Sequence, residues 1–226
     1  MRRKKDIQRR SFRGVAHADR QQQRREQLLE AGLQCFGTRG YHETTVRQVC
    51  AEARLTERYF YESFKDREAL VLAVYEAAVQ RLRTQVLEAL GNAPMDAMAV
   101  TRAGLGALFR FLHDDRRAAR ILMVEVLSVG QEADRLSRRV TLGFGELMQQ
   151  LLELLFPDAA RRHGLDPALV STGLLGASIH IAMRWTLNGF KEPLDDVLAA
   201  SLSIHEAMIQ AWGTPAPAKD RARSAD

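Results

Sequence analysis

The sequence has few cysteines, prolines and aromatic residues, and it has no long apolar run. Its 226 residues include two cysteines, Cys35 and Cys50, with no Cys-x-x-Cys pair and no metal-ligand spacing. This excludes a disulfide scaffold and a zinc module. No apolar run reaches the roughly 18 residues of a membrane span, and the basic start lacks the apolar region of a signal peptide. We therefore expect a cytoplasmic protein with two buried, reduced thiols. A redox switch between them remains an alternative.

Motifs of catalysis are also missing. The chain contains no Gly-rich phosphate loop, no Gly-x-Ser-x-Gly and no His-Glu-x-x-His. An acid such as Glu125 could serve an enzyme, but no motif accompanies it. The six histidines share no ligand-like spacing: His17, His42, His113, His163, His180 and His205. We therefore expect no catalytic site, no metal site and no cofactor.

The positive charge is concentrated at the start of the chain. Residues 1–20 hold eight Arg or Lys and two Asp, whereas residues 21–70 hold eight charges of each sign. Basic blocks are usually disordered, so we expect residues 1–19 to form a disordered basic arm. Such an arm can follow DNA phosphates or enter the minor groove. The alternative is a solvated tail with weak, sequence-independent DNA affinity.

The apolar spacing and the cap signals predict an all-α protein of about nine helices. Gly91 to Pro94 end one helix, and Asp166 followed by Pro167 opens another. Residues 157–166 are expected as a loop and residues 214–226 as a disordered tail. Two short helices between about residues 45 and 64 accompany longer ones at about 20–38, 67–90, 95–113, 116–128, 131–156, 167–188 and 193–212.

Residues 45–70 carry the most informative pattern. Thr45 and Gln48 form a capping-box pair at the start of a short helix, and Val46, Val49 and Cys50 give it one apolar face. A turn at residues 53–55 precedes Thr56, the N-cap of a second short helix. This is the layout of a helix-turn-helix, whose second helix lies in the DNA major groove.

The second short helix has two distinct faces. Phe60 and Phe64, four residues apart, should point into the core, which leaves Arg58 and the tyrosines for DNA. Arginine suits guanine edges, and tyrosine hydroxyls suit phosphates or bases. We expect phosphate contacts from Thr44, Thr45, Tyr61 and Lys65, and base reading by Arg58, Tyr59 and Glu57, with Arg47 a weaker candidate. The complete predicted DNA-binding set is Thr44, Thr45, Arg47, Thr56, Glu57, Arg58, Tyr59, Tyr61 and Lys65.

These residues resemble the TetR family of bacterial transcriptional regulators over about residues 24–75. Leu28, Leu29, Ala31 and Phe36 match its first helix, and Gly40-Tyr41 matches its Gly-aromatic break. Tyr61, Phe64, Lys65, Glu68 and Leu70 match its Tyr-x-x-Phe-Lys signature and the Glu and Leu that follow. Arg58 stands where Gly is frequent, so an operator sequence cannot be copied from a relative. Smaller departures are Gly32 for Ala, Cys35 for Leu and Arg67 for Lys.

The resemblance implies a DNA-binding domain at 20–70 and an effector-binding and dimerisation domain at 71–213. The last two helices are apolar on most sides and must be buried by neighbours, either in a homodimer, which the family's four-helix interface favours, or in a monomer core. The middle helices would hold a small, largely apolar effector, although such residues are more often ordinary core. The candidate pocket residues are Phe109, Leu112, Met123, Val126, Phe144, Met148, Met183 and Trp185.

The function implied is a repressor that an effector releases from a near-palindromic operator. The effector could be a lipophilic drug, a fatty acyl compound, an aromatic or a quorum signal. His180, Arg184 and Asn188 recur every fourth residue and could orient a polar head group or bond across a dimer interface. An activator, a ligand-independent regulator and a non-specific DNA binder driven by the arm remain alternatives.

Overall fold

The computed structural model describes the fold of residues 2–213, and their side chains from residue 19 onward. Within that range the secondary-structure elements are all helices, which confirms the all-α prediction. The helices divide into two compact units. The first contains the chain up to Val79 together with Arg116–Asp134, and the second contains Gln80–Asp115 and the chain from Arg135 onward. Two helices, α4 (Arg67–Gly91) and α7 (Gln131–Leu155), continue from one unit into the other.

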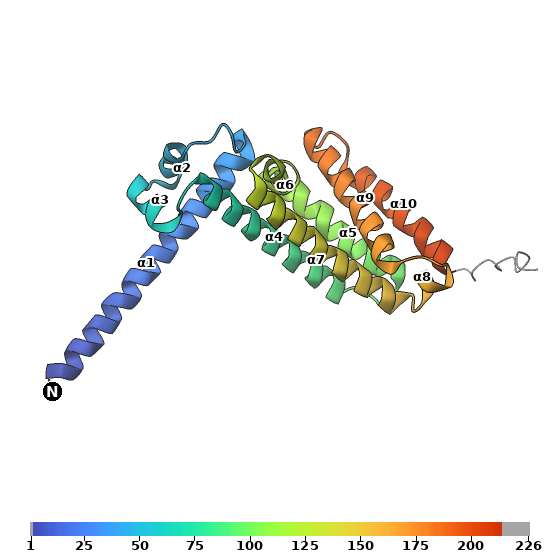
Figure 1. Ribbon diagram of the computed structural model, residues 1–226, viewed down its shortest axis with the longest axis horizontal. Helices are drawn as coiled ribbons and strands as arrows, with labels where there is room; N and C mark the ends of the chain where they lie inside the picture. The colour runs from blue at the N-terminus through green and yellow to red at the C-terminus, as the bar shows by residue number, and fades with distance from the viewer. Residues whose placement is uncertain (1, 214–226) are drawn as a thin grey trace, which may run out of the picture. The chain divides into compact units, whose positions relative to one another are not determined.

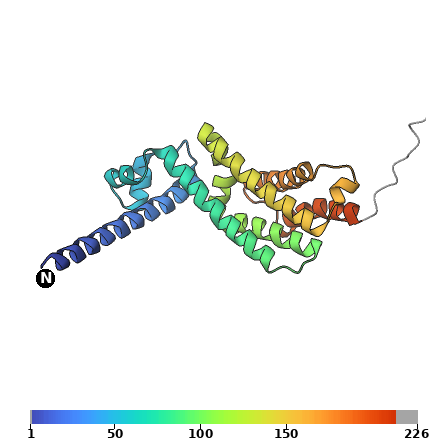
Figure 2. The same cartoon turned by 60° about the horizontal axis from the view of Figure 1, so that its bottom comes forward.

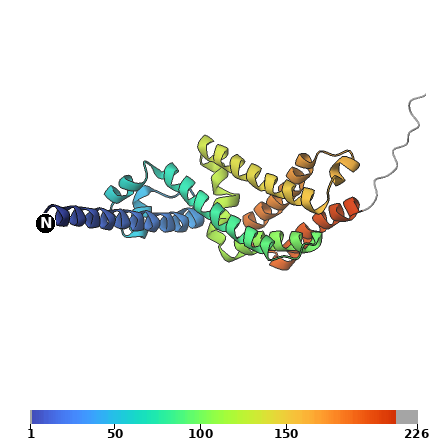
Figure 3. The same cartoon turned by 90° about the horizontal axis from the view of Figure 1, so that it is seen from below.

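The first unit is built on α1 (Arg2–Arg39), which Figure 3 shows as one straight helix. The short helices α2 (Val46–Ala53) and α3 (Glu57–Ser63) pack against its second half (Figure 1). The first part of α4, the helix α6 (Arg116–Met123) and the 3-10 helix η1 (Glu125–Ser128) also belong to this unit. Its core centres on Leu28, Phe36 and Phe60, which are fully buried.

The second unit is a helical bundle. Its helices are the second part of α4, α5 (Ala97–Asp114), most of α7, α8 (Ala159–Arg162), α9 (Pro167–Leu187) and α10 (Leu194–Gly213). In Figures 1 and 2, α10 lies along α5 and α9. One buried cluster contains Leu152, Ala159, Ala160, Leu174 and Trp212, with Met148, Phe156, Val170 and Met208 packed against it.

The first helix starts earlier than the sequence predicted. It begins at Arg2 and not near Arg20, so residues 2–19, expected as a disordered arm, continue α1. This stretch has no proline and consists largely of Arg, Lys, Gln and Ala, residues with favourable helix propensities. Once the second half of α1 is fixed by packing, each added residue costs little because helix growth is cooperative.

Most other helix ends agree with their predicted caps. The Asp166 side chain accepts a hydrogen bond from the Ala168 amide with Pro167 in the first turn, and Asp66 accepts one from Ala69 at the start of α4. The loop expected at 157–166 contains the one-turn helix α8, which no pattern in the sequence predicted. The tail expected at 214–226 lies outside the described residues. No helix in the described part is long and apolar enough to cross a membrane.

Candidate nucleic-acid interface

The two helices α2 and α3 are joined by a tight, well-capped turn. At the start of α2 the capping box is complete, since the Thr45 hydroxyl accepts from the Gln48 amide and the Gln48 side chain accepts from the Thr45 amide at 2.7 Å. At its end Arg54 adopts the left-handed conformation (φ 55°), and the Leu55 amide donates to the Cys50 carbonyl at 2.9 Å. Local capping thus fixes both ends of α2.

The inner face of α3 anchors it to the core. Phe60 is fully buried and Phe64 nearly so, and their ring centroids are 6.0 Å apart. The spacing of four residues brings them to one side of the helix, as the sequence predicted. The Arg25 guanidinium stacks 4.3 Å from the Phe64 ring and donates to the Ser63 carbonyl at 2.9 Å. This contact holds the C-terminal end of α3 against α1.

The opposite side of α3 is polar and exposed. The Arg58 side chain is 84% exposed, Lys65 just beyond the helix is 81% exposed, and Tyr61 is 57% exposed. Within the described residues Arg58 pairs with Glu62, one turn along, at 3.2 Å. Surface pairs of this kind contribute little free energy, so the guanidinium can exchange Glu62 for a guanine edge or a phosphate at low cost.

The other residues predicted to contact DNA differ in how far their side chains are exposed to solvent. Arg47, Thr45, Thr56 and Glu57 are exposed, and Thr56 occupies the N-cap position of α3 without a side-chain capping bond. Tyr59 is half-buried, because the Arg24 guanidinium lies 4.2 Å from its ring centroid.

Thr44 must be removed from the predicted set. Its side chain is fully buried, and its hydroxyl donates to the Gly40 carbonyl at 2.7 Å. It therefore has no surface to offer a phosphate. The pattern Thr44-Thr45 does not distinguish the two residues. Only the fold reveals that Thr44 faces α1 and Thr45 faces solvent.

Three arginines of this unit were missed as structural residues. Arg24 and Arg25 clamp α3 as described, and Arg67 donates to the Thr44 carbonyl at 2.6 Å while stacking 4.1 Å from the Tyr41 ring. The sequence signal was weak, because an arginine pair on a polar helix face usually indicates a solvated surface. Here the guanidinium planes cover aromatic rings.

Both thiols lie in this unit and are buried. Burial raises the pKa of the Cys35 thiol, with the Glu52 carboxylate adding to the effect and Arg39 opposing it. Burial also raises the pKa of the Cys50 thiol. Since the thiolate is the reactive form, both groups have the character of packing residues. Among residues 19–213, no cluster of His, Cys, Asp and Glu side chains could hold a metal ion.

The predicted effector residues are divided between the two units. Phe109, Leu112 and Trp185 are buried in the second unit, where the Trp185 ring lies 6.1 Å from Phe109 and 4.9 Å from Phe190. The half-buried members Phe144, Met148 and Met183 belong to the same unit. Met123 and Val126 lie instead on α6 and η1 in the first unit.

The polar stripe on α9 has partners in its own chain. Arg184 forms an ion pair with Glu192 at 3.0 Å, and Asn188 donates to the same carboxylate at 3.3 Å. The Trp185 indole donates to the Glu192 carbonyl at 2.9 Å. Two of the three stripe residues thus fix the turn after α9, while His180 is exposed. The contacts of Glu192, its own backbone first among them, lower the pKa of this carboxyl.

Comparison with known proteins agrees with this geometry. Residues 28–74 match the model of the bacterial regulatory proteins of the tetR family. An uncharacterized HTH-type transcriptional regulator, YerO of Bacillus subtilis, is 20% identical over 70% of the chain, which spans only 56% of that relative. The HTH-type transcriptional activator FasR of Mycolicibacterium smegmatis is 26% identical, over 84% of the chain and 82% of the relative.

A solved structure extends the likeness in fold to the second unit. The transcriptional regulator FadR from Bacillus subtilis, in complex with stearoyl-CoA, superposes with a TM-score of 0.71. The two sequences are 18% identical, and the superposition covers 82% of this chain and 98% of that one.

Proposed function

We propose that the chain is a DNA-binding transcriptional regulator of the tetR kind, the family whose model matches residues 28–74, and that it binds a near-palindromic operator as a homodimer. Each subunit would place α3 in the major groove of one half-site. The observation that carries this proposal is the exposed face of α3 with Arg58, Tyr61 and Lys65, on a helix whose other face buries Phe60 and Phe64. Such a regulator would act in the bacterial cytoplasm, where the chromosome lies.

The side chains divide by the DNA groups they suit. Arg58 would read a guanine edge with its two-pronged guanidinium, and Tyr59 and Glu57 would contact neighbouring bases, with Arg47 a weaker contributor. Thr45, Thr56, Tyr61 and Lys65 would contact phosphates and set the register. Glu57 also lies in the first turn of α3, where its negative charge favours the helix.

The dimer would form through α9 and α10. Both helices expose apolar side chains, with Leu169 71% exposed, Leu187 63% and Ile204 42%. On α9, a Cβ added to Gly173 or Gly176 would meet no atom within 4 Å. Exposed apolar residues beside an open, small-residue surface suit close packing with the same helices of a second subunit.

The effector site would lie in the second unit, near Phe109, Leu112 and Trp185, with Phe144, Met148 and Met183 as further candidates. Met123 and Val126 are left out because they belong to the other unit. The apolar, aromatic character of this core suits a largely apolar ligand. Since the related FadR structure holds stearoyl-CoA, long-chain acyl-CoA thioesters are the first class to test.

The effector would act by favouring one of two dimer states that differ in the separation of their recognition helices. Tenfold release from the operator requires about 1.4 kcal/mol of coupling. A repressor is our first proposal. The relative FasR is an activator, and the position of the operator relative to the promoter decides between the two roles.

The test is selection of bound sequences from a random duplex pool by the full chain at about 0.15 M salt, where non-specific binding is weak. A near-palindromic consensus supports the proposal. Enrichment of no motif would contradict it and favour the non-specific binder. A second arm adds stearoyl-CoA or free CoA to the operator complex, and release by the thioester alone supports the acyl class.

Removal of residues 1–18 distinguishes a sequence-specific regulator from a non-specific DNA binder that depends on the basic N-terminal residues. An arm-driven non-specific binder would lose its DNA affinity. A regulator that reads bases with α3 keeps the same consensus, with reduced affinity and a smaller salt dependence, because only phosphate contacts are lost.

A further inference from the structure

The segment of α6 and η1, residues 116–128, packs on α1 although it lies far from the helix-turn-helix in sequence. Ala118, Ala119 and Ile121 of α6 are fully buried in the first unit. The two helices approach so closely at Gly37 that a Cβ added there would lie 2.6 Å from Arg117 Cβ and 2.8 Å from its Cα. Arg117 also bonds Glu30 at 3.0 Å and Gln34 at 2.8 Å on α1.

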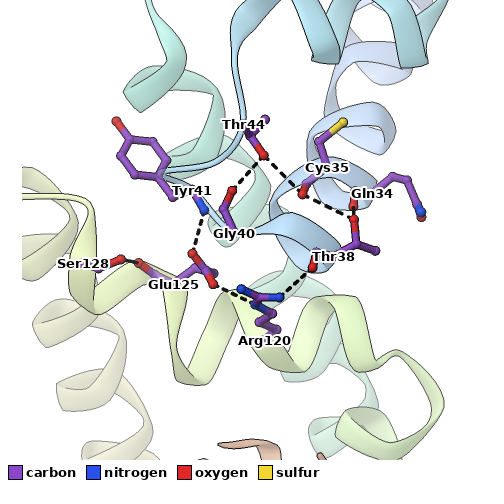
Figure 4. Close-up of polar contacts among 9 residues, drawn as sticks. All are labelled: Gln34, Cys35, Thr38, Gly40, Tyr41, Thr44, Arg120, Glu125 and Ser128. Carbon is purple, nitrogen blue, oxygen red and sulfur yellow. Dashed lines mark hydrogen bonds and ion pairs between the residues drawn. The ribbon is translucent and has the colours of Figure 1, made fainter.

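A buried carboxylate completes this contact. Glu125 is 6% exposed, and its Oε2 accepts from the backbone amide of Tyr41 at 2.7 Å. Its Oε1 accepts from Arg120 Nε at 2.7 Å, and Arg120 Nη1 donates to the Thr38 carbonyl at 2.6 Å (Figure 4). The pair therefore bonds both to the last turn of α1 and to the first residues beyond it.

The backbone at this point turns sharply. Gly40 has a φ of 95°, and a Cβ added to it would lie within 3.2 Å of both Glu125 carboxylate oxygens and 2.9 Å from Arg120 Nη2. The Tyr41 amide would be a buried donor without this carboxylate, and such a donor is costly to leave unpaired. Glu125 thus fixes the direction in which the chain leaves α1 for α2.

We propose that Glu125 and Arg120 are positioning residues for DNA recognition. They hold the Gly40-Tyr41 junction, and through it they set the placement of α2 and α3 against α1. Neither residue touches DNA, and both lie outside residues 28–74, which match the family model. This inference rests on the proposed function, because it concerns the affinity for the operator that α3 reads.

The test compares Glu125→Gln with Glu76→Gln, the same chemical change at an exposed position of α4 in the same unit. Glutamine has one acceptor oxygen and would turn its amide group toward a donor. We expect operator affinity to fall at least tenfold in Glu125→Gln and to change less than twofold in Glu76→Gln. Both changes remove a negative charge, which alone would strengthen DNA binding, so a fall cannot be a charge effect.

Two further readouts separate positioning from loss of fold. Amide exchange at Tyr41 should accelerate at least tenfold in Glu125→Gln, and affinity for random duplex at low salt should stay within twofold of the parent. Should Glu125→Gln fail to fold, Arg120→Lys takes its place, because it keeps the charge but cannot span both Glu125 and the Thr38 carbonyl. The same two readouts apply to it, with a loss of at least threefold in operator affinity expected.

The inference is overturned if Tyr41 exchange accelerates while operator affinity stays within twofold of the parent. It is also overturned if operator and random-duplex affinities fall by the same factor. If the parent chain selects no operator, the proposed function fails first and this inference fails with it. If the parent chain does select an operator but the variants do not show the expected loss of affinity for it, only this inference is overturned.

Discussion

Replacing Gly37 by alanine tests the close contact between α1 and α6. An added Cβ would lie 2.6 Å from Arg117 Cβ, which is 0.8 Å short of the 3.4 Å at which ordinary contact begins (3.4 Å less 2.6 Å). It would also lie 2.8 Å from Arg117 Cα and 2.9 Å from its carbonyl oxygen. These atoms belong to the backbone or next to it, so no side-chain rotation relieves the clash and α6 itself must move.

The expected free-energy change is the difference of two effects. Alanine in a helix is favoured over glycine by about 1 kcal/mol, and less near a helix end such as this. Overpacking of a core costs about 1–3 kcal/mol. We therefore expect Gly37→Ala to lower the free energy of unfolding by up to about 2 kcal/mol, and to lower Tm by up to about 4–8 °C at about 2–4 °C per kcal/mol.

Gly143→Ala is the matched control, because Gly143 also lies within a helix and a Cβ there would meet no atom within 4 Å. This variant should gain up to about 1 kcal/mol. Thermal and urea denaturation followed by circular dichroism measure both variants. If Gly37→Ala proves as stable as Gly143→Ala, the close approach of α1 and α6 is not present in solution.

Three other predictions concern DNA, pH and thiol chemistry. Arg58→Ala should relax base preference at one position of each half-site, at a cost of about 1–3 kcal/mol in binding the preferred sequence, whereas Lys65→Ala should weaken binding to all sequences alike and lower the salt slope by about one. Competition binding over a salt series measures both effects. An Arg58→Ala variant with parental specificity would mean that another face reads the bases. Burial lowers the pKa of His205 below its ordinary 6.5, with its bond to the Ser201 carbonyl opposing the shift, so the unfolded chain binds more protons and the free energy of unfolding should fall as pH drops below about 6.5. The Tm of His205→Gln should therefore fall less than that of the parent between about pH 7 and pH 5.5. An equal fall in both proteins would mean that other groups cause the pH dependence. Because burial raises the pKa of both Cys35 and Cys50, iodoacetamide should modify neither thiol in the native protein at neutral pH, as measured by mass spectrometry. Rapid labelling of either thiol would contradict this and favour a redox switch between them.

The sequence predicted the helix-turn-helix well because its signals are local. The Thr45–Gln48 capping box, the turn after Ala53 and the inward Phe60 and Phe64 all depend on residues within one or two turns of each other. Caps, breaks and apolar spacing are properties of short segments, so a pattern can specify them without knowledge of the fold.

The errors and omissions have a different origin. Nothing in the local pattern separates the buried Thr44 from the exposed Thr45, because α1 makes the difference. Glu125 stood out only as an acid without a motif, since its partner is the Tyr41 amide, 84 residues away in sequence. Met123 and Val126 were predicted as pocket residues from their apolar character, which does not distinguish a pocket from packing in the first unit, where both residues lie.

The position of α6 and η1 also has a consequence for recombination among regulators. The unit that contains the recognition helix α3 is not one continuous stretch, because Arg116–Asp134 belongs to it together with the chain up to Val79. A chimera with its junction between residues 80 and 115 would join α1 of one parent to α6 of the other. Gly37 and the Tyr41 amide of one parent would then contact α6 and η1 side chains of the other parent, which need not fit them. Exchange of sensing domains, in the laboratory or in evolution, should succeed when residues 116–134 travel with the DNA-reading parent.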